Sequence, residues 1–195
     1  MNIYLLRHGQ TEENRKGSYY GNLDISLNDI GVVQGNKAKD FFKDIKLDKV
    51  YVSDKKRTLE MAKLALGLKE IEIIQDSRIN ETNFGDFEGK TYEEIKILYP
   101  KECLCWTDNW KEFTPPEGES YIELCMRVKS FMDDIKKLDF DNILICAHSG
   151  VIRAIYCYIM DGNIDLFWKF GCKNGDISII KYEYGNLYID AIMHI

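Results

Sequence analysis

The sequence predicts an α/β fold, a three-layer α/β/α sandwich with a mostly parallel central sheet and a small insertion that forms a lid. Short apolar runs typical of buried strands alternate along the chain with longer amphipathic segments typical of helices. Two of these apolar runs, residues 2–6 and 142–147, lead directly into polar motifs that contain histidine. A chain of 195 residues is long enough to form one such domain with a full core.

In the first half of the chain, a polar loop over residues 9–26 follows the first strand. The expected strands cover residues 2–6, 49–52 and 70–74, and the expected helices cover 29–45 and 56–66. Ser53 or Asp54 is placed to cap the second of these helices, and Gly67 is placed to end it. The order strand, helix, strand, helix, strand is typical of a layered sheet.

In the second half, an insertion over about residues 90–120 interrupts the alternation of strands and helices. The expected elements are a helix over 91–99 that stops at Pro100, an irregular segment over 101–120, helices over 120–138 and 150–160, and strands over 143–147, 177–184 and 187–192. Gly185-Asn186 separates the last two strands as a two-residue hairpin turn. No linker divides the chain, so we expect one domain over residues 1–195.

Composition excludes several classes of partner. The net charge of −6 argues against non-specific nucleic-acid binding, because that requires a basic face. No apolar run approaches the ~20 residues of a membrane span, and the N-terminus lacks the pattern of a signal peptide. The six cysteines form no CxxC pair, so we expect reduced thiols and a cytoplasmic protein.

Arg7-His8-Gly9 is the most informative motif in the chain. It follows the first strand directly, at the end where open α/β sheets bind their ligands. Gly9 lets the backbone approach a ligand closely, and Asn14 adds a further donor within a turn of the chain. A surface histidine beside a surface arginine would carry no function, but the strand end favours a binding or catalytic site.

Two further segments carry candidate chemistry. Arg57 lies just inside the helix after the second strand, where both the helix N-terminus and the guanidinium favour an anion such as phosphate. The loop over residues 80–89 contains three acids among aromatic residues, and a carboxyl group in such surroundings can act as a general acid. Composition alone leaves open whether Glu81, Asp86 or Glu88 is that acid.

His148-Ser149-Gly150 ends the second apolar run, and a helix begins at the same point. Two histidines with carboxylates can bind zinc or iron, but arginines and a helix N-terminus beside them would repel a cation. The chain also lacks the glycine-rich motifs that bind nucleoside triphosphates and dinucleotides. We therefore expect a phosphate site built around a histidine nucleophile, with no metal and no cofactor.

These motifs, in this order, resemble the histidine phosphatase superfamily, also called phosphoglycerate mutase-like. The resemblance covers roughly the whole chain and rests on residues 6–14, 20–31, 53–62, 81–89 and 147–153. It implies that His8 is the nucleophile, that Arg7, Arg57 and His148 hold the phosphoryl group, and that Glu81 is the proton donor. The further candidates for substrate binding are Gln10, Asn14, Tyr20, Gly21, Ser149 and Trp106. Ser149 departs from the pattern, since many relatives have glycine there.

A finer resemblance is to the α-ribazole phosphatases of cobalamin biosynthesis, carried by residues 19–22, 106–119 and 168–175. It implies a small phosphate monoester as substrate and a monomer or homodimer. The aromatic residues near Trp106 are either packing or a wall for a flat base. Three alternatives stay open: a phosphoglycerate mutase, a broad-specificity sugar-phosphate phosphatase, and a binding module without activity, although an intact catalytic set argues against the last.

Overall fold

The computed structural model describes all of residues 1–195 and confirms the predicted α/β class. Its main sheet has six strands in the order β4-β3-β6-β1-β7-β8. These strands are β1 (Asn2–Arg7), β3 (Lys49–Val52), β4 (Ile73–Gln75), β6 (Asn142–Ala147), β7 (Ile177–Glu183) and β8 (Asn186–Met193). The first four in the spatial order run parallel, and the β7-β8 hairpin is added antiparallel at one edge.

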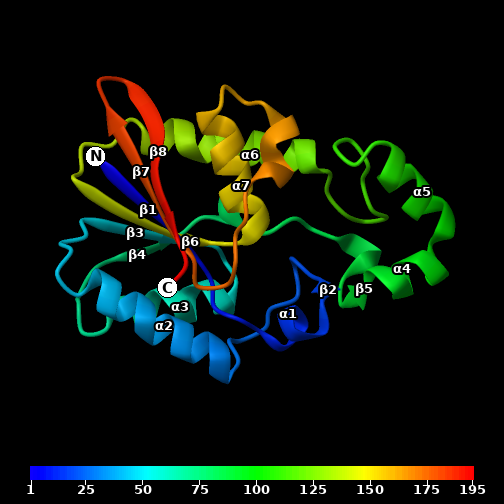
Figure 1. Cartoon of the computed structure of the whole chain (residues 1–195), viewed down its shortest axis with the longest axis horizontal. Helices are drawn as coiled ribbons and strands as arrows, with labels where there is room; N and C mark the ends of the chain where they lie inside the picture. Colours follow the sequence, from blue (N-terminus) through cyan, green and yellow to red (C-terminus); the bar gives the residue numbers. More distant parts are fainter.

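Four long helices cover the two faces of this sheet (Figure 1). They are α2 (Asp29–Phe42) and α3 (Lys56–Leu66) on one face and α6 (Tyr121–Ile135) and α7 (Ser149–Ile159) on the other. Because strand side chains alternate, Ile3 and Leu5 belong to the core beneath α6 and α7, whereas Leu6 belongs to the core beneath α2 and α3. None of the helices is both long and apolar enough to cross a bilayer.

The remaining elements gather beyond the carboxyl ends of the parallel strands (Figure 1). They comprise α1 (Glu12–Lys16), the two-stranded sheet of β2 (Ser18–Tyr19) and β5 (Lys90–Thr91), α4 (Tyr92–Leu98), α5 (Pro100–Asp108), and three 3₁₀ turns, η1 (Ser77–Ile79), η2 (Gly85–Phe87) and η3 (Ile164–Lys169). A small separate core holds this region together around Phe84, Phe87 and Ile95. That the insertion acts as a lid stays a prediction.

The structure corrects the predicted elements at several places. The helix expected before Pro100 is confirmed as α4, but the segment over 101–120 is not irregular throughout: α5 starts at Pro100, because the first position of a helix needs no N–H donor. The supposed loop over 9–26 contains α1, which Thr11 and Asn14 cap reciprocally. The hairpin turn is Tyr184-Gly185, one residue earlier than expected, and both residues have positive φ as a type I′ turn requires.

The cap of α3 also differs from the expectation. Lys55, not Ser53 or Asp54, occupies the N-cap position and makes no side-chain cap. Ser53 instead uses its buried hydroxyl within the site described below.

Candidate active site

The sheet register brings the two histidine motifs together. β1 and β6 are parallel neighbours in which Arg7 pairs with Ala147, so the next residue of each strand is a histidine. His8 N–H donates to the carbonyl of Ala147 (3.0 Å), and the two imidazole centroids lie 5.1 Å apart. Residues separated by 140 positions thus form one site at the carboxyl ends of the strands, as expected for this fold class.

A backbone carbonyl fixes the tautomer of His8. Its Nδ1 lies 2.7 Å from the carbonyl oxygen of Gly9. Because a carbonyl can only accept, Nδ1 carries the proton, and Nε2 is left with its lone pair and no protein partner. Burial and the positive charges of Arg57 and Arg7 hold the pKa of His8 well below its usual value. A neutral imidazole with a free Nε2 is the form that a nucleophile needs.

His148 is held just as firmly beside it. Arg57 Nε–H points at His148 Nδ1 (3.3 Å), which must therefore accept, so His148 Nε2–H donates to the hydroxyl of Ser53 (2.8 Å). Burial, with the charge of Arg57, keeps the pKa of His148 well below its usual value as well. Both histidines in the site are thus neutral, and the positive charge resides on the arginines.

The two arginines are placed for an anion. Arg57 is fully buried, forms no ion pair, and donates to the carbonyls of Gly21 (2.9 Å) and Leu23 (2.8 Å). Arg7 donates to the carbonyl of Cys172 (2.5 Å), but its Nε is buried without any partner. Buried polar groups are almost always satisfied, so this orphaned donor indicates a ligand that accepts hydrogen bonds. Burial also lowers the pKa of Arg57, as expected for an unpaired internal cation.

Glu81 follows η1 in the chain and lines the same cavity as His8. Its carboxylate accepts from the backbone N–H groups of Gly150 (3.1 Å) and Thr82 (3.0 Å). The first of these donors is the second residue of α7, so the start of that helix fixes the position of one carboxyl oxygen. Of the three acids that the sequence left open, only Glu81 lines the cavity that contains His8. Glu88 instead binds backbone N–H groups of Gly21 and its neighbours.

A cavity of about 290 Å³ connects these groups. Its walls include six of the predicted site residues, namely Arg7, His8, Asn14, Tyr20, Glu81 and Ser149. Arg57 and His148 lie fully buried behind this lining. The Tyr20 ring covers Arg57, whose Cζ lies 4.8 Å from the ring centroid, and its hydroxyl bonds Thr11 (2.6 Å).

Three predicted substrate-binding residues lie outside this cavity. The side-chain oxygen of Gln10 accepts from Asn28 (3.0 Å), at the start of α2. Gly21 acts through its backbone, whose carbonyl holds Arg57. Trp106 stacks against Phe113 at 5.8 Å in the small separate core and also borders a second cavity of about 240 Å³.

Several residues that contact the site were not anticipated. Asn174 donates to the carbonyls of His8 (3.0 Å) and Gly9 (3.3 Å) and to the side chain of Asn14 (3.0 Å), so it ties the nucleophile loop to the chain before β7. Thr58 bonds the Ser53 hydroxyl (2.8 Å) that holds His148. The contacts of Asn174 gave no signal in the sequence because 166 residues separate it from His8, whereas Thr58 is only five residues from Ser53 and its contact depends on the local path of the chain into α3.

No group of three or more His, Cys, Asp or Glu side chains is arranged to hold a metal ion. The site contains two neutral histidines, one glutamate, and three arginines without ion pairs, of which Arg7 and Arg153 line the cavity and Arg57 lies behind it. Such a set can bind a phosphoryl dianion, present a nitrogen nucleophile to it and exchange a proton with a leaving group.

Comparison with known proteins agrees with this chemistry. The sequence pattern of the histidine phosphatase superfamily (branch 1) matches residues 3–193. The chain belongs to the histidine phosphatase superfamily. Its relatives include phosphoserine phosphatase 1 of Hydrogenobacter thermophilus, 31% identical over 93% of this chain and 86% of that protein. They also include the adenosylcobalamin/α-ribazole phosphatase of Escherichia coli, 25% identical over 92% of this chain and 90% of that one.

Solved structures show the same fold. The α-ribazole phosphatase of Shigella flexneri superimposes with a TM-score of 0.94 at 24% identity, covering 98% of this chain and 96% of that one. Together with the family match, the named relatives make this histidine phosphatase a phosphoric monoester hydrolase.

Proposed function

We propose that this histidine phosphatase hydrolyses α-ribazole 5′-phosphate, a step in cobalamin biosynthesis, through a phosphohistidine on His8 and without a metal. The observation that carries the choice of substrate is an aromatic groove beside the phosphoryl cavity. The two cavities share three walls, Tyr19, Tyr121 and Trp168, and the second is completed by Tyr92, Trp106, Thr107 and Trp110. A flat benzimidazole base fits such a groove, because aromatic faces bind planar rings well.

The reaction has two steps. The Nε2 lone pair of His8 attacks phosphorus, the bond to the leaving oxygen breaks, and Glu81 gives its proton to that oxygen. Water then attacks the phosphohistidine, Glu81 takes a proton from it, and the electron pair of the N–P bond returns to Nε2. Arg7, Arg57 and His148 stabilise the charge on the phosphoryl oxygens in both transition states. To donate its Nε2–H to a phosphoryl oxygen, His148 must release the hydroxyl of Ser53, while Nδ1 keeps its bond from Arg57.

The first test uses a matched pair of substrates in EDTA, α-ribazole 5′-phosphate and ribose 5-phosphate. They differ only in the base, so a base-binding groove predicts a kcat/KM ratio of about 100, which is about 2.7 kcal/mol of discrimination. Trp168→Ala should reduce this ratio while leaving turnover of ribose 5-phosphate nearly unchanged. A ratio near one in the wild type would reject the base as a recognition element and favour a broad-specificity sugar-phosphate phosphatase.

A second candidate substrate is phosphoserine, on which a relative named above is reported by name to act. One residue favours it. Arg153 lines the cavity, stacks on Trp168 with its Cζ 4.8 Å from the ring, donates Nε–H to the carbonyl of Phe170 (3.1 Å), and forms no ion pair. Its remaining donors suit a carboxylate.

Phosphoethanolamine is phosphoserine without the carboxylate, so the two substrates isolate this contact. Preference for phosphoserine that disappears in Arg153→Gln would move the assignment to phosphoserine. Equal rates on both substrates would reject phosphoserine as the substrate.

Exchange between 2- and 3-phosphoglycerate that depends on 2,3-bisphosphoglycerate would instead identify a mutase. A cytoplasmic location and a monomeric or dimeric state stay predictions of the sequence.

A further inference from the structure

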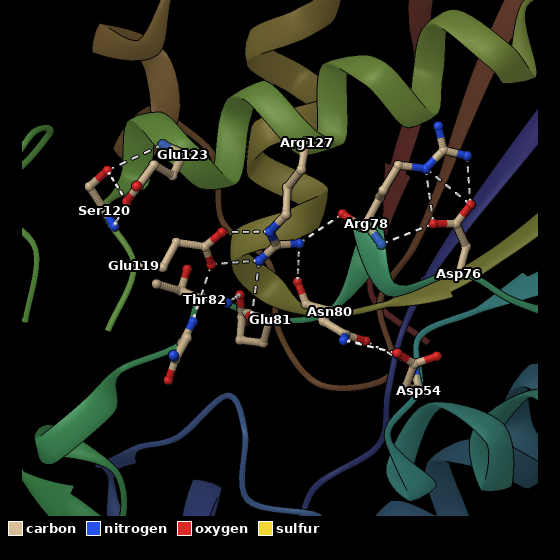
Figure 2. Close-up of polar contacts among 11 residues, drawn as sticks. Asp54, Asp76, Arg78, Asn80, Glu81, Thr82, Glu119, Ser120, Glu123 and Arg127 are labelled. Atoms are coloured by element: carbon tan, nitrogen blue, oxygen red, sulfur yellow. Dashed lines mark hydrogen bonds and ion pairs between the residues drawn. The ribbon is translucent and has the colours of Figure 1, made fainter. Parts of the chain in front are cut away.

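The segment that carries Glu81 has no regular secondary structure. Residues 81–84 belong to no helix or strand, so no ladder of backbone hydrogen bonds fixes the direction of this side chain. The proposed proton donor nevertheless needs a defined position, since misplacing a catalytic group by 1 Å can reduce a rate by about 100-fold. Arg127 of α6 and Glu119, which lies just before α6, bond this segment and the residues before it (Figure 2).

Arg127 of α6 bonds the chain at Glu81 and just before it. All five of its guanidinium N–H groups have acceptors. Three of them donate to backbone carbonyls of the segment: Nη1 to Arg78 (2.7 Å) and Asn80 (2.7 Å), and Nη2 to Glu81 itself (3.2 Å). The side chain does not line the cavity, so it cannot touch a substrate bound there.

Glu119 fixes the guanidinium from the other side. It accepts Arg127 Nε (2.6 Å) and Nη2 (2.8 Å) in the bidentate geometry that orients an arginine best. The same carboxylate accepts the backbone N–H of Asn83 (3.2 Å), beyond Glu81 in the chain. Arg127 therefore bonds the chain before the general acid, and Glu119 bonds it after the general acid. Their side chains are 21% and 17% exposed, so solvent screens the pair weakly.

We propose that Arg127, oriented by Glu119, is the positioning residue for the general acid Glu81. This inference rests on the proposed function, since it assigns a partner to the acid of that mechanism. It makes a distinct prediction, because an arginine that only stabilises the fold would affect all substrates alike. A misplaced acid lowers kcat/KM, which reports formation of the phosphohistidine, only for those substrates whose leaving group needs a proton.

The test compares Arg127→Met with Arg78→Met on three phosphate esters with increasingly basic leaving groups, 2,4-dinitrophenyl, 4-nitrophenyl and phenyl phosphate. Arg78 is a matched control, because its side chain pairs with Asp134 and with Asp76 and does not contact Glu81. Figure 2 shows its pair with Asp76. For Arg127→Met we expect kcat/KM to fall about 100-fold on phenyl phosphate and less than about threefold on the dinitrophenyl ester. Arg78→Met should leave the dependence on the leaving group unchanged.

Two further variants separate the carbonyl contacts from the ion pair. Exchanging the charges in the double variant Arg127→Glu, Glu119→Arg restores an ion pair but places no donors on the carbonyls, so the phenyl phosphate defect should persist. In Arg127→Ala, added guanidinium at low millimolar concentration should recover activity on phenyl phosphate selectively. Recovery in the exchanged pair, or equal rescue of every ester, would contradict positioning through the carbonyls.

A uniform loss on all three esters, accompanied by a lower melting temperature, would overturn the proposal and leave Arg127 a structural residue. Failure of the proposed function has a different signature. Rapid acid-free quenching of the wild type with the dinitrophenyl ester should trap phosphate on His8. Absence of that adduct would reject the mechanism itself, whereas its presence with an unchanged leaving-group dependence in Arg127→Met would reject only the positioning role.

Discussion

Replacing Gly150 by alanine should damage catalysis without damaging the fold. Gly150 is the second residue of α7, and its N–H donates to Glu81 Oε2 (3.1 Å). A Cβ at this position would lie 2.3 Å from Glu81 Oε1 and 3.2 Å from Glu81 Cδ. Ordinary contact distances then require the carboxyl group to retreat by about 1 Å.

The expected magnitude follows from that displacement. A shift of this size in a general acid corresponds to about a 100-fold loss in kcat/KM, or about 2.7 kcal/mol, on esters with basic leaving groups. The helix itself gains, because alanine is favoured over glycine at a helical position by about 0.5–1 kcal/mol. Gly150→Ala should therefore melt within a few degrees of the wild type while losing most of its activity.

The assay measures kcat/KM on phenyl and 2,4-dinitrophenyl phosphate together with thermal unfolding. Gly171→Ala is the matched control, since a Cβ at that glycine meets nothing within 4 Å. We expect the control to resemble the wild type in both measurements. If Gly150→Ala retained phenyl phosphate activity within about threefold of the wild type, the carboxyl group would not need its present position, and the assignment of Glu81 would be refuted.

Three other predictions concern the histidines and the acid. His8→Ala should abolish turnover and the trapped phosphoenzyme while circular dichroism stays native; residual activity above about a tenth of wild type would contradict a nucleophile. Glu81→Gln should lower kcat/KM on phenyl phosphate far more than on the dinitrophenyl ester, and an equal loss of kcat/KM on both would remove it as the acid. Because the pKa values of His8 and His148 are depressed in the folded state, the unfolded chain binds more protons once pH falls below about 6.5. The free energy of unfolding, measured in urea, should then fall with pH by up to about 1.4 kcal/mol per unit for each histidine, and His8→Asn should remove one of these contributions.

The core of the site was predictable because its motifs occur at strand ends. Arg7-His8 and His148 each follow an apolar run, and parallel strands bring their carboxyl ends to one edge of a sheet. The choice of Glu81 over its acidic neighbours was not accessible from composition. It depends on which carboxyl group meets the N–H of Gly150, and that contact spans 69 residues of chain.

The insertion was harder to predict for a different reason. Local rules correctly ended the first helix before Pro100, at Leu98, but they missed the new helix that starts at the proline after a single intervening residue. The apolar residues of this region pack against one another in their own small core, and the main sheet contributes nothing to it. The spacing of apolar residues normally predicts which helix face packs on the sheet, so in this region it says little about where the helices lie. The sequence did not predict the contacts of Arg127 either, because they are made to backbone carbonyl groups, which no pattern of side chains specifies.

The electrostatics of the site link substrate binding to the strength of the nucleophile. Arg7 and Arg57 have no carboxylate partners, and their charges contribute to the low pKa of His8. A phosphoryl dianion that binds between them cancels part of this field, so the pKa of His8 rises when the substrate arrives. The imidazole therefore stays unprotonated before binding, then becomes a more basic nucleophile in the complex. In the proposed mechanism, the arginines that bind the phosphoryl oxygens would by the same linkage also prepare the group that attacks phosphorus.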